Sequence, residues 1–450
     1  MKTDVLVIGG GPGGVISAIV GRTIYPDKKF ILVRKEQKSI VPCGIPYVIN
    51  RLKSAEENIM GDAPLKAKEV EIVIDEVINV DRKKKVAQLA SGKEIAFQKL
   101  VLATGSKPVV PSSIKGIDLE NIFPIKKELN YLKHLREQIH NFKNIVIVGG
   151  GFIGVEFADE ISKLPNKNIS IIELSDHLLD QSFDEEFSEK VENILRKEKV
   201  NIYTQSQVGG FKGNKKVEYV LLNNGKEIPA DVVILSIGSR PNTDLAEEIG
   251  LDVSPLGGIK VDEFMKTSDS DIFAVGDCVE KRCFFCRKHI DVMLASTATA
   301  EARSAGANLF HLKIIEMNKG TIGIYSTKVG DLALATAGHT EKKAIEEGYE
   351  IVTGISKGID RHPGTLPDKH ELYVKLIFSK YSGIIMGAQI YGADSVGELI
   401  NTIGLAIQNK LTITDIATIQ YGTHPLLTSA PTTYPLIACA LDAFKKIHEF

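Results

Sequence analysis

Residues 5–14 read V-L-V-I-G-G-G-P-G-G, an apolar run that leads into a glycine-rich turn. Gly9, Gly11 and Gly14 stand at G-x-G-x-x-G spacing, and the stretch V-I-S-A-I-V that follows is typical of a helix. A second apolar run, Phe30–Val33, completes a strand–helix–strand pattern. Glycines at these positions permit a tight turn and let a pyrophosphate approach the backbone at the helix N-terminus. The stretch therefore predicts a Rossmann-like dinucleotide-binding domain.

The position that normally binds a ribose departs from the usual pattern. An acidic residue about 20 positions beyond the glycines normally holds a ribose hydroxyl. This chain has Arg34 there, followed by Lys35 and Glu36. The ribose contact is therefore in question, and Arg34 and Lys35 are the candidate cofactor-binding residues at this position.

The same pattern recurs about 140 residues later. Residues 145–154 read I-V-I-V-G-G-G-F-I-G, and the next apolar run, Ile169–Ile172, ends on Glu173, the acid that the motif requires. The candidate binding residues of this second motif are Gly149, Gly151, Ile153, Gly154 and Glu173. Two such motifs in order predict two nucleotide cofactors, and two glycine-rich turns without a ligand are the alternative.

Three further apolar runs end on turn residues. Residues 99–106 (K-L-V-L-A-T-G-S), 231–242 (D-V-V-I-L-S-I-G-S-R-P-N) and 270–277 (S-D-I-F-A-V-G-D) each read as a strand followed by a turn. Asp277 comes directly after a glycine, where a carboxylate can accept hydrogen bonds from a polyol chain; a helix cap is the more common role of such a residue. The candidate binding residues at these strand ends are Thr104, Gly105, Gly238 and Asp277.

Residues 39–50 read S-I-V-P-C-G-I-P-Y-V-I-N and place Cys43 before Gly44, at the start of an apolar run that can begin a helix. A thiol at a helix N-terminus faces the positive end of the helix dipole, which lowers its pKa from about 8.5 to roughly 3.5–7.5. Cys43 is therefore the candidate nucleophile and redox group. A buried structural cysteine is the alternative, because cysteine is among the most buried residue types.

The composition is that of an ordinary globular protein. With 450 residues, 43% hydrophobic and 25% charged, the chain is long enough for about two to four domains. Its net charge of −2 gives no reason to expect a nucleic acid or an acidic membrane surface as partner. No apolar run approaches the roughly 18–20 residues that span a bilayer, and the first predicted strand leaves no room for a signal peptide. We therefore expect a cytoplasmic protein, whose five cysteines are too few for a disulfide scaffold.

From about Thr321 the sequence changes character. Residues 371–378 and 384–390 alternate like antiparallel strands, and residues 395–407 and 433–447 have helical periodicity. No nucleotide motif occurs in this part, so we expect an α+β domain with a different role.

Together and in this order, the motifs G-G-G-P-G-G, C-G-I-P-Y, A-T-G-S, G-G-G-F-I-G-V-E and F-A-V-G-D resemble those of the FAD- and NAD(P)H-dependent pyridine nucleotide-disulfide oxidoreductase family. The resemblance covers nearly the whole chain. It implies a glutathione-reductase-like α/β fold with two Rossmann-like domains and a C-terminal α+β domain. The FAD-binding domain would cover residues 1–115 and 250–320, the NAD-binding domain 116–249 and the dimerisation domain 321–450.

The single cysteine in S-x-x-x-C-G-x-P-Y resembles one branch of this family: NADH oxidases, NADH peroxidases, coenzyme A-disulfide reductases and persulfide or sulfur reductases. This implies FAD and NADH as cofactors and a Cys43 thiol that cycles next to the flavin. The implied electron acceptor is a small molecule: coenzyme A disulfide or another disulfide, a persulfide, sulfur or O₂. The alternatives are a reductase of a small iron protein such as rubredoxin, which would not need Cys43, and a signalling flavoprotein with little turnover.

Other positions qualify the resemblance. Pro12, a candidate cofactor-binding residue of the first turn, replaces a histidine of the family's peroxidases, which argues against a dedicated peroxidase. His424 resembles the general acid that two-cysteine reductases send across a homodimer, although a loop role is more common for such a residue. Tyr421 and Tyr434 stand where coenzyme A-disulfide reductases keep tyrosines near the active site, with interface packing as the alternative.

A cysteine-rich segment follows the Asp277 motif. Cys278, Cys283, Cys286 and His289 lie within twelve residues, and a C-x-x-C pair is a redox or metal signature in the right context. The family has a variable surface hairpin here, so we expect a plain hairpin with two thiols and no metal. An auxiliary dithiol and a zinc site are the alternatives.

Overall fold

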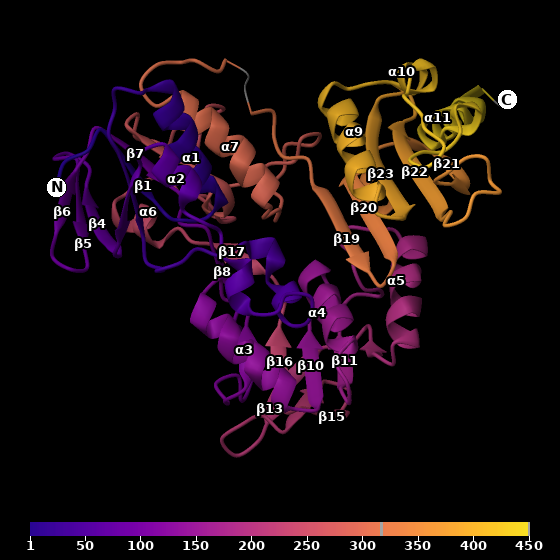
Figure 1. The fold of residues 1–450 in the computed structure, drawn as a ribbon, viewed down its shortest axis with the longest axis horizontal. Helices are drawn as coiled ribbons and strands as arrows, with labels where there is room; N and C mark the ends of the chain where they lie inside the picture. Colours follow the sequence, from indigo (N-terminus) through magenta and orange to yellow (C-terminus); the bar gives the residue numbers. More distant parts are fainter. Residues whose placement is uncertain (316–317, 449–450) are drawn as a thin grey trace. The chain divides into compact units, whose positions relative to one another are not determined.

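The computed structural model describes residues 1–315 and 318–448 (Figure 1). The chain divides into two compact units, each built from three separate stretches. Unit 1 comprises Met1–Ser112, Phe123–Asn141 and Ile237–Thr321, and unit 2 comprises Ser113–Ile122, Phe142–Ser236 and Ile322–Phe450. The domain limits expected from the sequence stay a prediction, because one compact unit can hold more than one domain.

A five-stranded parallel sheet forms the centre of unit 1, in the order β18-β7-β1-β2-β3. Its strands are β1 (Val5–Ile8), β2 (Phe30–Arg34), β3 (Glu71–Ile74), β7 (Lys99–Leu102) and β18 (Ile272–Ala274). The inner strands are buried and rich in Val, Ile and Leu, as expected for a parallel sheet covered on both faces. The expected strands at residues 5–8 and 30–33 are confirmed by β1 and β2.

Helices cover one face of this sheet and a small antiparallel sheet covers the other. The helices α1 (Pro12–Ile24) and α7 (Ala295–Ala307) pack side by side (Figure 1). Small residues allow this approach: a Cβ on Gly306 would lie 2.7 Å from the carbonyl oxygen of Ser17. The small sheet consists of β4 (Val77–Asp81), β5 (Val86–Leu89) and β6 (Glu94–Ala96).

Shorter segments connect these layers; the label η marks 3₁₀ helices. The strands β8 (Ser106–Pro108) and β17 (Ser239–Pro241) pair in antiparallel fashion. The remaining elements of unit 1 are η1 (Pro42–Gly44), η2 (Pro46–Val48), η3 (Ala55–Asn58), α2 (Ala63–Ala67), β8 (Ser106–Pro108), α3 (Leu129–Asn141), β17 (Ser239–Pro241), α6 (Asp244–Glu248) and η4 (Gly276–Cys278). The strand β9 (Ile122–Pro124) begins at the last residue of the stretch Ser113–Ile122 of unit 2 and continues into the stretch Phe123–Asn141 of unit 1.

Unit 2 contains a second parallel sheet, in which β12, β11, β10 and β16 are successive neighbours. Its strands β10 and β11 confirm the runs expected at residues 145 and 169. The elements around this sheet are β10 (Asn144–Val148), α4 (Phe152–Ser162), β11 (Asn168–Ile172), α5 (Glu185–Lys197), β12 (Asn201–Tyr203), β13 (Val208–Lys212), β14 (Tyr219–Leu222), β15 (Glu227–Pro229) and β16 (Val232–Leu235).

The C-terminal part of unit 2 is an antiparallel sheet in the order β19-β20-β23-β22-β21, with helices packed on it (Figure 1). The expected strands and helices are confirmed, but the expected alternation is wrong: seven of the nine residues of β22 are buried, because this strand lies inside a sheet covered on both faces. The elements are β19 (Ile324–Val329), β20 (Leu332–Gly338), α8 (Glu341–Glu346), β21 (Ile351–Ile359), β22 (Glu371–Ser379), β23 (Ile385–Gly392), α9 (Val396–Gln408), α10 (Ile413–Thr418), η5 (Pro431–Thr433) and α11 (Pro435–His448).

A buried charged cluster joins the two sheets of unit 2. The Lys375 ammonium of β22 lies 2.9 Å from carboxylate oxygens of Asp184 and of Glu186, and 2.6 Å from that of Glu341. Asp184 also accepts a hydrogen bond from the side-chain amide of Gln389. Burial lowers the pKa of Lys375, but hydrogen bonds to the three carboxylates outweigh that effect and raise it. The cluster therefore fixes the start of α5 against the C-terminal sheet.

A helix must be long and predominantly apolar to cross a lipid bilayer. Within residues 1–315 and 318–448, no helix is both long enough and apolar enough to cross a membrane.

Candidate active site

The first glycine-rich turn joins β1 to α1 and leaves open space in front of the helix. Gly9 has φ +119°, and a Cβ there would lie 2.1 Å from the carbonyl oxygen of Ala103. A Cβ on Gly14 would lie 2.0 Å from the carbonyl oxygen of Gly9, so both positions require glycine. At Gly11, the N-cap of α1, a Cβ would meet no atom within 4 Å. This cradle fits a pyrophosphate, which the unpaired N–H groups of a helix N-terminus can bind.

Arg34 donates hydrogen bonds to other residues of the chain. Its NH1 and NH2 groups bind the two carboxylate oxygens of Asp62 at 2.6 and 2.8 Å, and its N–H groups also bind acceptors in residues 36–39. The hydrogen bond from Arg34 lowers the pKa of Asp62. Lys35 forms an ion pair with Glu76. In this structure Arg34 therefore holds the loop that leads to Cys43, and the expected contacts of Arg34 and Lys35 with a cofactor stay predictions.

The turn after β7 is fixed by a crossing segment of the chain. The Thr104 hydroxyl donates to the carbonyl oxygen of Asn242 at 2.7 Å, and the Asn242 amide donates to the carbonyl oxygen of Thr104 at 3.2 Å. Gly105 and Gly238 have φ +70° and +99°, which favour glycine. The structure thus places Thr104 and Gly105 beside Asn242, whereas Gly238 lies at the other end of the β8–β17 ladder, where its carbonyl oxygen accepts the N–H of Val109 at 3.0 Å.

Asp277 lies in η4, directly after β18, and its carboxylate has two partners that the sequence did not reveal. The Ser106 hydroxyl donates to Oδ2 of Asp277 at 2.8 Å, and the Lys127 ammonium lies 3.1 Å from the same oxygen. Lys127 also donates to the Ser106 hydroxyl at 3.1 Å. The three side chains form a polar group in unit 1 that can bind hydroxyl groups, and the expected contact of Asp277 with a polyol stays a prediction.

A buried ion pair clamps the peptide groups next to Asp277. The Gly276 N–H donates to a Glu301 carboxylate oxygen at 2.8 Å, and the Lys281 ammonium donates to the Gly276 carbonyl oxygen at 2.7 Å. Lys281 and Glu301 are 3.0 Å apart, and each residue is 5% exposed. Burial raises the pKa of Glu301, which the positive charge of Lys281 opposes. Sequence reasoning missed this pair, because its members are separated along the chain and belong to no motif.

Cys43 is exposed, so the alternative of a buried structural cysteine is wrong. The expected helix is also wrong: residues 42–44 and 46–48 form two separate 3₁₀ turns, η1 and η2. Pro46 explains this, because it has no N–H to donate to the carbonyl of residue 42, four positions earlier. A single 3₁₀ turn carries no helix dipole of the expected strength, so that argument for a thiolate fails.

The turn that carries Cys43 is held by the segment around Asn58. The Val41 N–H donates to the Asn58 carbonyl oxygen at 2.9 Å, and the Asn58 amide donates to the Val41 carbonyl oxygen at 3.0 Å. A Cβ on Gly44 would lie 2.0 Å from the Asn58 side-chain oxygen, so the C-G pair needs its glycine. The thiol is therefore exposed on a well-fixed loop, which suits an encounter with a dissolved molecule.

The second glycine-rich turn, in unit 2, repeats the geometry of the first. Gly149 has φ +104°, a Cβ on Gly154 would lie 2.0 Å from the Gly149 carbonyl oxygen, and a Cβ on Gly151 would meet no atom within 4 Å. Glu173 lies where the motif places its acid: its carboxylate accepts the N–H of Gly150 at 2.6 Å and that of Ser175 at 2.7 Å. The turn and the acid together fit the pyrophosphate and ribose of a dinucleotide. Ile153, within α4, stays a predicted contact.

His424 and its neighbouring tyrosines belong to unit 2, whereas Cys43 belongs to unit 1. His424 is exposed, and its Nδ1 accepts the N–H of Leu426 at 3.3 Å. The rings of Tyr421 and Tyr434 are stacked with their centroids 4.3 Å apart. Burial, and to a smaller extent Tyr434, raises the pKa of Tyr421 to about 12, so both phenols are neutral near pH 7. Catalysis by His424 stays a prediction.

Comparison with known proteins identifies the family. The model of the pyridine nucleotide-disulphide oxidoreductase family matches residues 3–302, and that of its dimerisation domain matches residues 324–435. The chain is 31% identical over 448 residues to the NAD(P)H coenzyme A polysulfide/persulfide reductase of Pyrococcus horikoshii, with 98% of each chain covered. It is 29% identical to the NADH oxidase of Methanocaldococcus jannaschii, with 98% of this chain and 99% of that protein covered.

A solved structure agrees with these matches. The NAD-dependent persulfide reductase from A. fulgidus superposes with a TM-score of 0.91 at 30% identity, over 99% of this chain and 83% of that one. The two glycine cradles, the acid at the second and the family match therefore agree. The chain belongs to the pyridine nucleotide-disulfide oxidoreductase family and is an FAD-dependent enzyme that oxidises NADH.

Proposed function

We propose that this enzyme transfers electrons from NADH through Cys43 to a small sulfur compound, namely a disulfide, a persulfide or sulfur, or to O₂. The exposed thiol on the fixed Pro42–Gly44 turn carries the proposal, because it stands in the same unit as the FAD-type cradle. The names of the relatives, which include reductases of persulfide and polysulfide, support a sulfur acceptor. A reductase of a small iron protein would have no use for this thiol.

FAD, when bound, supplies the acceptor for the hydride of NADH and the two-electron chemistry. The chain holds the two nucleotides and presents the thiol. For a disulfide acceptor, Cys43 attacks one sulfur as a thiolate, forms a mixed disulfide and releases one thiol. Two electrons from NADH then break the mixed disulfide and regenerate the Cys43 thiolate. The balance is NADH, a proton and one disulfide to NAD⁺ and two thiols.

Steady-state NADH oxidation tests this function, with each acceptor supplied separately, without oxygen and in air. We expect consumption of NADH without oxygen to depend on an added disulfide, persulfide or sulfur. Turnover in air alone, with no response to any sulfur compound, would contradict a sulfur acceptor and leave O₂ as the acceptor. Rapid reduction of a small iron protein, with no response to a sulfur compound or to O₂, would contradict the proposal.

Glu173 should make the enzyme prefer NADH over NADPH. A 2′-phosphate would meet the Glu173 carboxylate, which already accepts the Gly150 N–H, and like charges in contact are unfavourable. We expect kcat/KM to be more than about tenfold higher for NADH. Glu173→Ala should narrow this ratio, whereas Glu227→Gln, at an exposed position of β15, should leave it unchanged. Equal kcat/KM values for the two nucleotides in the unaltered enzyme would refute the assignment.

The enzyme should be a homodimer formed through its C-terminal part. Large apolar side chains are exposed there: Leu426 is 51% exposed, Leu427 69% and Leu441 53%. These residues lie in or next to the segment that matches the dimerisation domain, and apolar exposure of this kind is typical of an interface. Light scattering coupled to size exclusion at micromolar concentration should give the mass of two chains. A fully active monomer would rule this out.

A further inference from the structure

A short hairpin follows the Asp277 turn in unit 1 and carries the C-x-x-C pair. The Cys283 N–H donates to the carbonyl oxygen of Lys288 at 2.8 Å, and the Arg287 N–H donates back to the carbonyl oxygen of Cys283 at 3.1 Å. On its other side, the Phe284 N–H donates to the carbonyl oxygen of Thr321 at 3.1 Å. The expected hairpin is confirmed, and its backbone is fixed from both sides.

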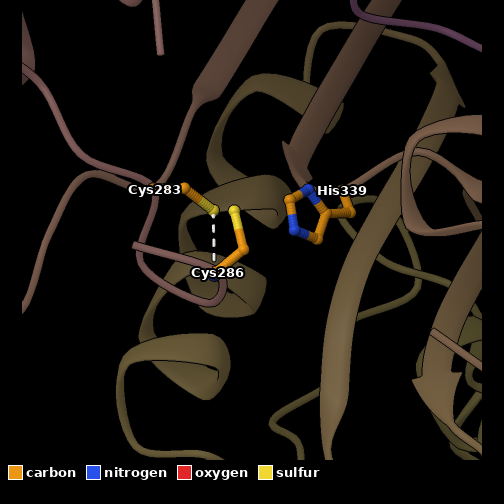
Figure 2. A group of neighbouring side chains, drawn as sticks. All are labelled: Cys283, Cys286 and His339. Atoms are coloured by element: carbon orange, nitrogen blue, oxygen red, sulfur yellow. Dashed lines mark hydrogen bonds between the residues drawn. The ribbon is translucent and has the colours of Figure 1, made fainter. Parts of the chain in front are cut away.

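The two thiols of this hairpin lie close together (Figure 2). The backbone N–H of Cys286 donates to Sγ of Cys283 at 3.5 Å, and the two sulfur atoms lie within 4.8 Å of each other. Cys283 is buried, whereas Cys286 is half-buried. The third side chain drawn in Figure 2, His339, belongs to unit 2.

This spacing places the two sulfur atoms within reach of each other through side-chain rotation. A disulfide requires sulfur atoms about 2.05 Å apart. Rotation of one cysteine between staggered χ1 wells displaces its sulfur by on the order of 3 Å, which covers the remaining distance. The other two cysteines outside the active-site turn, Cys278 and Cys439, are each 0% exposed and are not accessible to a dissolved reagent.

We propose that Cys283 and Cys286 form a second, reversible dithiol–disulfide centre that reacts with small-molecule disulfides. The Cys286 thiol gives its proton to water, and the thiolate attacks one sulfur of the disulfide, forms a mixed disulfide and releases one small thiolate. The Cys283 thiol passes its proton to this thiolate and attacks Sγ of Cys286, which forms the intramolecular disulfide and releases a second thiolate that takes up a proton from water. Two protein thiols and one small disulfide thus give one protein disulfide and two small thiols, with two electrons moving to the small molecule.

The order of attack follows from the surroundings of the two sulfurs. Cys286 is the more exposed, so it meets the dissolved disulfide first. Burial raises the pKa of Cys283, so this thiol forms a thiolate less readily than an ordinary cysteine. Once Cys286 carries a mixed disulfide, the short separation of the two sulfurs makes the second attack intramolecular.

Thiol counting on the full-length holoenzyme tests the proposal. The Cys43→Ser chain, which removes the other accessible thiol, is reduced, freed of reductant without oxygen and exposed to hydroxyethyl disulfide. It is then denatured, alkylated with a maleimide, weighed as an intact chain and digested to peptides. We expect the loss of two alkylated thiols, a peptide with an internal bond between residues 283 and 286, and a single two-electron step when the ratio of thiol to disulfide is varied.

Single substitutions in the same background check each step. Cys283→Ser should accumulate the mixed disulfide on Cys286, and Cys286→Ser should leave Cys283 available to the maleimide. An unchanged thiol count, or a mixed disulfide that persists in the chain with both cysteines, would overturn the proposal. So would one zinc ion per chain that disappears in Cys283→Ser/Cys286→Ser.

The centre is independent of the function proposed for Cys43, and one variant keeps the two separate. With Cys43 intact, Cys283→Ser/Cys286→Ser should retain FAD, NADH oxidation and most acceptor reduction. Loss of acceptor reduction with NADH oxidation intact would contradict this independence and place the hairpin on the main electron path. A Cys43→Ser chain that no longer reduces the acceptor but still forms the disulfide between Cys283 and Cys286 would support both proposals.

Discussion

Cys43→Ser is expected to lower kcat for reduction of a small disulfide or persulfide by at least about a hundredfold, because the hydroxyl cannot replace the thiolate as nucleophile or redox group. Hydride transfer from NADH should keep its rate, since the thiol acts after that step. Stopped-flow absorbance of the flavin without oxygen separates the two steps. Some O₂ consumption should survive, because oxygen can accept the electrons without a thiol.

The matched control replaces two other thiols of unit 1. Cys283→Ser/Cys286→Ser removes twice as many sulfur atoms by the same chemical change and should leave most disulfide reduction intact. Full disulfide reductase activity in Cys43→Ser would refute the central proposal. Slow hydride transfer in that variant would show that the substitution disturbs the cofactor site, which the exposed position of Cys43 does not predict.

The sequence predicted the nucleotide-binding halves well, because their signals are local. A side chain at Gly14 would overlap the carbonyl oxygen of Gly9, five residues earlier, and one at Gly9 would overlap that of Ala103, at the end of the neighbouring strand β7. The glycines therefore mark the turn by themselves. The strands before each turn are uniformly apolar because the parallel sheets bury both faces. Glu173 was placed correctly since its distance from the motif is fixed by one helix and one strand.

The site was less predictable where partners come from distant parts of the chain. Nothing in the sequence pairs Arg34 with Asp62, or gives Asp277 its contact with Lys127, which lies 150 residues away. The expected helix at Cys43 failed for a local reason that could have been used: Pro46 follows three residues later and interrupts the hydrogen bonds of a helix. The apolar run there was a poor guide, because it also suits two short 3₁₀ turns, of which only the second carries buried residues.

The C-terminal sheet shows the same limit in another form. Residues 371–378 and 384–390 were expected to alternate, but β22 and β23 are buried on both faces. Lys375 and Gln389 lie within these strands, are 4% and 0% exposed and bind Asp184. Polar residues in a strand therefore indicated a buried cluster rather than contact with solvent.

Glu301→Gln and Lys281→Met should each weaken the binding of FAD. The ion pair holds both the N–H and the carbonyl oxygen of Gly276, and Asp277 follows directly in the chain. Glu301→Gln leaves a buried ammonium without its counter-charge, and removal of one partner of a buried pair costs about 3–5 kcal/mol. Either variant weakens the contacts that fix Gly276, so the Asp277 carboxylate is positioned less precisely for the polyol that it is predicted to bind, although Ser106 and Lys127 still contact it.

Titration of FAD into the apoprotein checks this, and we expect an increase in Kd of at least about tenfold, or 1.4 kcal/mol. Lys260→Met and Glu263→Gln make the same chemical changes at exposed positions of unit 1 and should bind FAD normally. The rise in Tm on adding FAD separates positioning from general stability. If the pair only stabilised the fold, each variant would lower the Tm of the apoprotein and of the holoenzyme by the same amount. The rise in Tm on adding FAD would then equal that of the unaltered chain. If the ion pair positions Gly276 for FAD binding, the rise in Tm on adding FAD should be smaller in both variants and normal in the two controls.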